Sequence, residues 1–235
     1  MSVGDTYSGP AIVESPFTTV VVDPGATVTR VESGSLVLSP ARDPEVTMER
    51  HRLSISSDPA QLAVLNNRMQ AIVRAMQNTL FRTARSGLIN TGRDFSCCIV
   101  SADDELLASA ESLPIHVMAG PDLIAKRMKE LHPTLHAGDV FLHNSPYSGN
   151  SHPADHTLIA PVIDAEGRHQ FSVLVKAHVA DCGNSVPISY FSVARDVYHE
   201  GALLFDCAKV EDQYDRVEDV LRMCKLRLRA PEMWW

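Results

Sequence analysis

One long amphipathic helix constrains this sequence more than any other feature. Asp58 and Pro59 suit its first turn. An aspartate can accept hydrogen bonds from the free backbone N–H groups of that turn, and proline lacks a backbone N–H that would have no partner there. Apolar side chains then recur at steps of three or four residues and form one stripe: Leu62, Leu65, Met69, Ile72, Met76 and Leu80. Gly87 is the expected terminator. We expect this stripe to be buried against another layer and to serve core packing rather than chemistry.

The sequence after the helix predicts the layer on which it packs. Short runs rich in β-branched and aromatic residues flank turns of Asp, Ser and Gly, a pattern typical of β-hairpins. The expected strands are 95–100, 105–110, 139–143, 157–163 and 170–176, and the expected helices are 122–131 and 215–228. Strands and helices do not alternate strictly. We therefore expect the α+β class, with the long helix packed on β-hairpins or a mixed sheet.

The first forty residues form a small all-β appendage in this interpretation. Short β-branched runs occur at 11–13, 18–22, 27–31 and 35–38, separated by proline and glycine. So few short strands are not expected to bury a core of their own. The predicted organisation is therefore an appendage over 1–40, a linker over 41–57 with a short helical piece around 46–53, and a main domain over 58–235.

Composition narrows the class of protein. The 235 residues are 45% hydrophobic and 21% charged, which favours a packed core over disorder. The net charge of −8 and the scattered basic residues argue against nucleic acid or an anionic membrane as partner. No run of about eighteen apolar residues and no signal peptide occurs. The five cysteines are odd in number, which suits a reducing compartment, so we expect a cytoplasmic protein.

The densest cluster of chemically useful side chains lies in the loop 142–156. His152 and Asp155, with His156 beside them, offer imidazole nitrogens and a carboxylate within a short span. His178 follows the next hairpin, which returns the chain towards this loop, and Asp94 lies at the start of an earlier strand. Two histidines with one or two aspartates suit Zn, Mn or Fe(II) in an open site.

The spacing alone leaves an alternative, in which these histidines are solvated or hydrogen-bonding residues. The cysteines lack CxxC spacing and indicate no structural zinc site. The remaining histidines have no clustered partners, and we expect most of them to be ordinary surface or half-buried residues: His51, His116, His132, His136, His169 and His199.

Several familiar catalytic motifs are missing from the sequence. It has no GxxxxGK[ST] phosphate loop and no GxGxxG dinucleotide motif. It also lacks the GxSxG of acyl-transfer serines and the HExxH of metalloproteases. Any dependence on a nucleotide would have to come from another polypeptide.

Taken together, the motifs resemble the N-terminal half of the hydantoinase B family over residues 58–235. The motifs that carry the resemblance, in order, are Asp58-Pro59, Gly92-Arg93-Asp94-Phe95-Ser96-Cys97, Leu113-Pro114-Ile115-His116, Gly138-Asp139-Val140, Pro146-Tyr147 with Gly149 and His152, and His178-Val179-Ala180-Asp181. The family includes subunits of hydantoinases, 5-oxoprolinases, caprolactamase-like enzymes and ATP-dependent acetone and acetophenone carboxylases.

The first forty residues are similar to something else, the C-terminal β segment of the hydantoinase A family, the ATP-binding partner. The matching stretches are Ser8-Gly9-Pro10-Ala11-Ile12-Val13-Glu14, Thr18-Thr19-Val20-Val21-Val22 and Pro24-Gly25. This resemblance implies a split, hetero-oligomeric enzyme whose partners are an A-type ATP-binding subunit and the rest of the B-type protein. Trp234 and Trp235 would then be buried against a partner chain.

The resemblance to hydantoinase B also implies a metal site. The family's ligands correspond to Asp94, His152, Asp155 and His178, and the metal would be Zn or Mn. His156 or Asp181 would orient a ligand or move a proton. One departure concerns the family's Asn-Asp-Pro-Tyr, which reads Asn144-Ser145-Pro146-Tyr147 here, so an acidic residue is missing.

The implied activity is that of a subunit of an ATP-dependent ketone carboxylase, with acetophenone carboxylase as the nearest type. Its substrates would be a ketone and bicarbonate, with ATP and Mg on the partner subunit and the metal stabilising an enolate. The first alternative is an ATP-dependent hydrolase of cyclic amides or imides. The second is a non-catalytic assembly subunit of such a complex.

Overall fold

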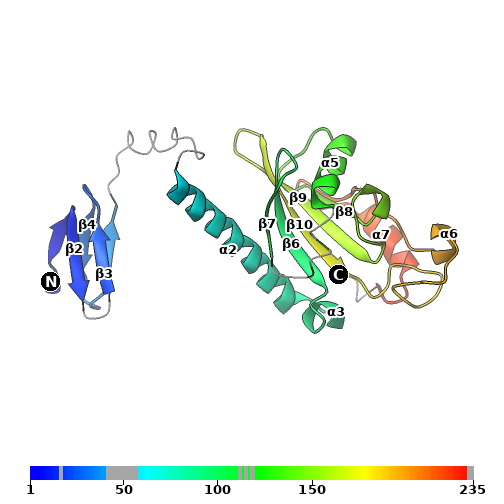
Figure 1. The fold of residues 1–235 in the computed structure, drawn as a ribbon, viewed down its shortest axis with the longest axis horizontal. Coiled ribbons are helices and arrows are strands. Elements are labelled where there is room, and N and C mark those ends of the chain that lie inside the picture. Colours follow the sequence, from blue (N-terminus) through cyan, green and yellow to red (C-terminus); the bar gives the residue numbers. More distant parts are fainter. Residues whose placement is uncertain (16–17, 41–57, 111–112, 114–115, 117–119, 232–235) are drawn as a thin grey trace. The chain divides into compact units, whose positions relative to one another are not determined.

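The computed structural model describes residues 1–15, 18–40, 58–110, 113, 116 and 120–231. The chain divides into two compact units, Met1–Pro59 and Ala60–Trp235 (Figure 1). The predicted linker with its helical piece, His51 and the two C-terminal tryptophans lie outside the described residues. Among the described residues, no helix combines the length and the apolar character needed to cross a membrane.

The first unit consists of short strands, as the sequence predicts. Its strands are β1 (Thr6–Ser8), β2 (Ala11–Ser15), β3 (Thr18–Val22), β4 (Thr27–Arg30) and β5 (Leu36–Ser39). Three of them form a sheet in the order β1-β4-β5, and β2 and β3 form a hairpin. Val22, Ala26 and Val28 are buried together between these strands. The unit therefore buries a small core of its own, contrary to the expectation, because the hairpin supplies a second apolar layer.

The second unit is built on one seven-stranded sheet with the order β12-β11-β8-β9-β10-β6-β7. Its strands are β6 (Phe95–Ser101), β7 (Leu106–Ser109), β8 (Val140–His143), β9 (Asp155–Ile163), β10 (His169–His178), β11 (Ala208–Asp212) and β12 (Asp215–Arg216). Every pair of neighbours is antiparallel, so the sheet is not mixed. Both predicted hairpins are present, as β6 with β7 and as β9 with β10.

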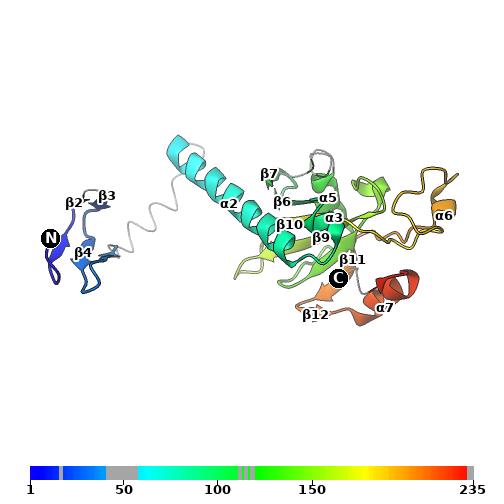
Figure 2. The ribbon, with the colours of Figure 1, turned by 90° about the horizontal axis from the view of Figure 1, so that it is seen from below.

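Helices cover both faces of this sheet. The helices are α2 (Pro59–Thr83), α3 (Gly87–Asn90), α5 (Pro121–Leu131), α6 (Val197–Glu200) and α7 (Glu218–Arg227), with a 3-10 turn η2 (Pro146–Ser148). Val73 of α2 shares a buried cluster with Cys97, whereas Met128 of α5 shares another with Cys98. Because Cys97 and Cys98 are consecutive in β6, their side chains point to opposite faces. The helices α2 and α5 therefore lie on opposite faces of the sheet (Figures 1 and 2).

The α+β class with a long helix packed on hairpins is confirmed, and the differences are local. Met69, Met76 and Leu80 of α2 pack on the sheet, but Leu62 and Ile72 of the same stripe are exposed. The stripe therefore extends beyond the covering layer lengthwise at Leu62 and sideways at Ile72, which lies between the packed Met69 and Met76.

Several boundary predictions were wrong, two of them at the ends of helices. Gly87 begins α3 instead of ending α2, because Ser86 caps the new helix by accepting a hydrogen bond from Leu88 N–H. The predicted helix over 215–228 starts as strand β12 and becomes helical only at Glu218.

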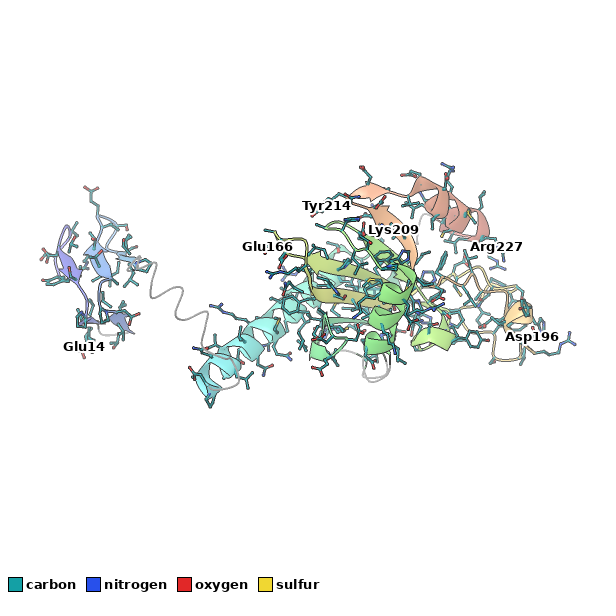
Figure 3. All side chains as sticks on the ribbon, turned by 90° about the horizontal axis from the view of Figure 1, so that it is seen from above. Glu14, Glu166, Asp196, Lys209, Tyr214 and Arg227 are labelled. Carbon is teal, nitrogen blue, oxygen red and sulfur yellow. The ribbon has the colours of Figure 1, made fainter. Side chains whose placement is uncertain are left out.

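Strand β11 was not predicted from the sequence. Its Lys209, labelled in Figure 3, lies with Nζ 3.1 Å from Asp139 and 2.9 Å from Asp212. This ion pair joins β11 to the start of β8, its neighbour in the sheet. The pairing brings the C-terminal part of the chain against the strands that carry the candidate site.

Candidate metal centre

The predicted ligands meet at one edge of the sheet, on the α5 face. Asp94 immediately precedes β6, Asp155 is the first residue of β9, and His178 is the last residue of β10. Asp155 and His178 are directly paired across β9 and β10, and the backbone N–H of His178 donates to the carbonyl oxygen of Asp94 at 3.0 Å. Since neighbouring strands are antiparallel, the starts of β6 and β9 coincide with the end of β10.

Asp155 lies at the centre of the cluster and is 1% exposed. Its Oδ1 lies 3.1 Å from His152 Nε2 and 3.1 Å from His178 Nδ1, and its Oδ2 lies 3.2 Å from His116 Nε2. The hydroxyl of Ser151 also contacts Oδ2. Burial would raise the pKa of Asp155, but the hydrogen bonds from these four side chains outweigh it and hold the pKa well below the usual range. The carboxyl is therefore an anion at any physiological pH.

Asp94 completes the cluster from the side of β6. Its Oδ1 lies 3.5 Å from His116 Nε2, and its Oδ2 lies 3.9 Å from His178 Nδ1. The side chain of Asp94 is 27% exposed, whereas those of His116 and His178 are each 3% exposed. Asp94 is thus the more exposed of the two carboxylates.

His116 was expected to be an ordinary histidine, and that expectation was wrong. Its Nε2 contacts the carboxylates of both Asp94 and Asp155, and the residue is almost completely buried. Nothing near it in the sequence forms a cluster. The only signal was its place in the Leu113-Pro114-Ile115-His116 motif that contributed to the family resemblance.

His152 and Tyr190 form the more open wall of the cluster. His152 Nδ1 accepts a hydrogen bond from Ala154 N–H at 3.2 Å, which leaves Nε2 directed at Asp155. The hydroxyl of Tyr190 lies 3.1 Å from the same Nε2. The Tyr190 ring is centred 4.6 Å from the His152 ring and 5.0 Å from the His178 ring, and Tyr190 is 52% exposed. Tyr190 therefore packs over the two imidazoles from the solvent side, a contact that the sequence did not reveal.

The chemistry of this donor set fits a divalent transition metal. The ligand atoms of His152, Asp155 and His178 all lie within 4.8 Å of one another, and so do those of Asp94, His116 and Asp155. Asp155 belongs to both groups. Imidazole nitrogen combined with carboxylate oxygen suits Zn, Mn or Fe(II).

The two residues expected to assist from outside the ligand set lie elsewhere. His156 points to the α2 face, because it follows Asp155 in β9, and its ring packs edge-on to Phe205 at 5.9 Å. Asp181 accepts hydrogen bonds from the backbone of Gly183, Arg229 and Ala230, and its carboxylate pairs with the Arg229 side chain. Asp181 is therefore engaged by the backbone near Arg229, and His156 lies on the face of the sheet opposite to Asp155.

Comparison with known proteins identifies the family of the chain. Residues 58–235 match the family described as Hydantoinase B/oxoprolinase. The chain belongs to the hydantoinase B/oxoprolinase family.

Three relatives illustrate the relationship. The chain is 31% identical to 5-oxoprolinase 1 of Arabidopsis thaliana over 225 residues, 95% of this chain and 17% of the relative. It is 30% identical to caprolactamase subunit beta of Pseudomonas jessenii over 173 residues, 74% of this chain and 29% of the relative. The nucleotide-free structure of acetone carboxylase, from work on ATP-dependent acetone carboxylation, superposes with a TM-score of 0.69 at 25% identity and covers 77% of this chain and 24% of that one. The chain thus spans less than a third of each relative.

The departure from the family's acidic motif falls in the loop that carries His152. The carbonyl oxygen of Ser145 accepts hydrogen bonds from the N–H groups of Ser148 and Asn150, each at 3.2 Å, and so closes the η2 turn. Neither bond uses the Ser145 side chain. The turn therefore forms without the acidic residue that the family usually has there.

Two asparagines fix the rest of this loop. Asn144 Nδ2 donates to the carbonyl oxygens of Pro153 and Leu203, and Asn150 Nδ2 donates to those of His152 and Asp155. Asn150 Oδ1 accepts from the hydroxyl of Thr157 at 3.0 Å. Buried polar groups held in this way orient the ligands next to them. These asparagines were not singled out from the sequence, because asparagine is common in ordinary loops.

A second group of ligand-type side chains lies nearby, formed by His143, Asp206 and Cys207. It is a poorer metal site. Arg127 binds both carboxylate oxygens of Asp206, at distances between 2.7 and 3.2 Å, and so occupies that ligand. Burial raises the pKa of the Cys207 thiol to about 12, and a protonated thiol does not ligate metals well.

Proposed function

We propose that this chain contributes a metal-dependent, carbonyl-activating site to an ATP-dependent enzyme. The observation that carries the proposal is the buried carboxylate of Asp155, contacted by three imidazoles with a second carboxylate at the edge. A bound Zn or Mn ion would polarise the carbonyl oxygen of a small substrate or stabilise an enolate.

The protein's own residues supply orientation in this scheme. His116, His152, Asp155, His178 and Asp94 would hold the ion, and the two asparagines of the loop would fix the carboxylate and imidazole ligands. Tyr190 would shield the His152 and His178 rings from bulk water, and its hydroxyl, next to His152, is positioned to exchange a proton with a bound substrate. ATP and Mg would be bound by a partner subunit.

Ketone carboxylation is the first candidate reaction, with a ketone and bicarbonate as substrates. Its support is the superposition on acetone carboxylase, which extends over 77% of this chain. In this reaction the site would stabilise the enolate oxygen while the new carbon–carbon bond forms. Acetophenone and acetone carboxylases are the types we favour within this class.

Hydrolysis of a cyclic amide or imide is the second candidate and has support of equal weight. The 5-oxoprolinase relative matches 95% of this chain, and caprolactamase subunit beta matches 74% of it. In this reaction the site would polarise the ring carbonyl for attack by water.

The same coverages bear on the domain organisation and on the partners. Residues 58–235 alone would account for about three quarters of the chain, the share that caprolactamase subunit beta matches, whereas 5-oxoprolinase matches a share that must include part of the first unit. We therefore retain the proposed division into an A-type β segment over 1–40, a linker over 41–57 and a B-type region over 58–235. An A-type ATP-binding subunit and the remainder of a B-type protein are the proposed partners in a hetero-oligomer.

One assay separates the two reactions. The chain is purified with its co-purifying subunits, and ATP consumption is followed with ketone plus bicarbonate, and separately with a hydantoin or a lactam. Each reaction predicts stimulation by its own substrate only. The variant His178→Ala should abolish the response, and His136→Ala, outside the cluster, should leave it unchanged. Full activity of both His152→Ala and His178→Ala would contradict the metal-dependent scheme and favour a purely structural role.

A further inference from the structure

Three adjacent rows of side chains cross the α5 face of the sheet near the candidate metal centre, and the middle one of these has no obvious structural role. The first row is apolar and lies in the core under α5: Phe141, Ile159, Leu174 and Cys98, from β8, β9, β10 and β6 in that order. The last row carries Asp155 and His178 of the candidate metal centre. Directly paired residues share a face of an antiparallel sheet, so the rows follow from the strand register.

The middle row is entirely polar. Its members are His143 of β8, Thr157 of β9, Lys176 of β10 and Ser96 of β6, each paired with the next. They are between 0% and 3% exposed. Burying four polar side chains side by side is costly unless each finds a hydrogen-bond partner. The polar groups of the row must therefore either hydrogen-bond to other groups of the protein or bind a ligand.

Two donors of the row are not satisfied. Lys176 Nζ and His143 Nε2 are buried and have no hydrogen-bond partner within the described part of the chain. His143 Nδ1 lies 3.3 Å from the backbone N–H of Cys207 and accepts from it, so the neutral ring carries its proton on Nε2, as a donor. The hydroxyl of Thr157, which lies between them in the row, donates to Asn150 Oδ1, and neither orphan atom donates to the Thr157 oxygen in the described part of the chain. Both orphan atoms thus require an acceptor.

The nearby acidic groups are already engaged. Asp155 is the closest carboxylate in the register, and its two oxygens already receive four contacts from His116, Ser151, His152 and His178. Asp206, beside His143, is bound by Arg127. Cys98, beside Lys176, is a neutral thiol because burial raises its pKa to about 12. The lysine charge is therefore not matched by a direct carboxylate contact.

We propose that Lys176 and His143 form a binding site for one small oxyanion next to the candidate metal centre. The ligand class is a carboxylate-sized anion, such as bicarbonate or the carboxylate of an organic substrate, whose oxygens would accept from Nζ and Nε2. An ammonium and a neutral imidazole together prefer an acceptor that carries charge. The existence of the site is inferred from the buried polar row alone. The identity of the anion rests on the proposed function.

The test uses the full chain after treatment with a chelator, so that no metal can bind the anion. The thermal unfolding temperature is measured against sodium bicarbonate and, separately, sodium acetate, with chloride keeping the ionic strength constant. The variants are Lys176→Met and His143→Phe, and Lys126→Met removes a lysine of α5 outside the buried row as the matched control.

The unmodified chain should be stabilised by increasing bicarbonate, acetate or both, and the Lys126→Met variant should respond equally. Lys176→Met and His143→Phe should weaken the apparent affinity at least about tenfold, since each removes a hydrogen bond to a charged ligand. Stabilisation by bicarbonate alone would favour the carboxylating anion, and stabilisation by acetate alone would favour a substrate carboxylate.

Lys176→Met has a second readout that a structural role would move in the opposite direction. Without anion, this variant should unfold at the same or a higher temperature, because methionine keeps the length and removes a buried, unpaired cation. A lower unfolding temperature in chloride, or equal stabilisation of the parent chain and Lys176→Met, or no stabilisation by either anion would each overturn the proposal. Because the assay contains neither metal nor ATP, its failure would leave the proposed function untouched, and the ATP assay tests that separately.

Discussion

Asp155 and His156 are consecutive in β9 and both buried, yet their surroundings are opposite. Asp155 faces α5 and is 1% exposed, within contact of three imidazoles. His156 faces α2 and is 8% exposed, at a cavity of about 310 Å³ lined mainly by apolar side chains of α2, β8, β9 and β10. Burial removes water from both groups, and hydrogen bonding decides whether each one carries a charge.

The pKa values express this difference. The pKa of Asp155 is held below its usual range because hydrogen bonds to its anion outweigh burial. The pKa of His156 is lowered to about 4 because burial disfavours its cation more than the neighbouring Asp155 charge favours it. At this end of β9, the α5 face therefore stabilises charge and the α2 face excludes it.

The largest effect is expected from Asp155→Asn. The variant removes the charge shared by both ligand groups and should lower the affinity for Zn or Mn by at least about 100-fold. The matched variant His156→Gln, one residue away on the opposite face, should bind metal like the parent chain. Competition with a chromophoric chelator measures both affinities. Equal losses of metal affinity in the two variants would contradict the assignment of the metal centre to the α5 face.

Replacing His116 should have the next largest effect. We expect His116→Ala to weaken metal binding by about 10-fold to 100-fold, because it removes an imidazole that contacts both carboxylates. His132→Ala is a useful contrast, since His132 contacts the carbonyl oxygen of Cys207 instead. The same titration applies. An unchanged metal affinity in His116→Ala would mean that His116 only positions the two carboxylates and is not a metal ligand.

The apolar face predicts a pH dependence of stability. Because the pKa of His156 is about 4 in the folded chain and about 6.5 when unfolded, the unfolded state binds more protons between these values. The contribution is fully present above pH 6.5 and is lost as the pH falls towards 4, amounting to about 2 kcal/mol by pH 5. Urea unfolding of the parent chain and His156→Leu at pH 7 and pH 5 measures it. The variant should lose less stability than the parent chain, and identical losses would contradict the assignment.

The smallest effect is expected from Tyr190→Phe. The variant removes one hydroxyl contact to His152 at an exposed position but keeps the ring packing. We expect a change of about threefold or less in metal affinity, as for a hydrogen bond open to water. A loss as large as that of His116→Ala would mean that the hydroxyl itself belongs to the ligand shell.

The architecture was predictable from the sequence because hydrophobic periodicity and the turn residues between elements are local features of the chain. The stripe of α2 and the hairpins of β6, β7, β9 and β10 needed no tertiary information. The quartet Asp94, His152, Asp155 and His178 was also accessible, since hairpin closure brings its members to one edge and the family motifs marked them. Strand boundaries were less accurate. Because β9 was expected to begin at 157 instead of Asp155, the alternation that directs His156 away from the site went unnoticed.

Other members of the site depend on register, which the sequence does not state. The partners of His116 lie 22 and 39 residues away, at Asp94 and Asp155, and no local pattern links them. Lys176 resembles an ordinary strand lysine until its pairing with Thr157 and Ser96 places it in a buried row. Asp181 was favoured by a short motif, but its carboxylate serves the backbone near Arg229.

Anomalous diffraction from crystals of this chain soaked with Mn²⁺ and then with Zn²⁺ tests the central claim most directly. The account predicts one peak within about 2.0–2.6 Å of ligand atoms from Asp155 and His178, with Asp94 adjacent. It also predicts that Asp155→Asn crystals lack the peak. A peak at His143, Asp206 and Cys207, or no peak with either ion, would contradict the assignment of this edge of the sheet as a metal centre.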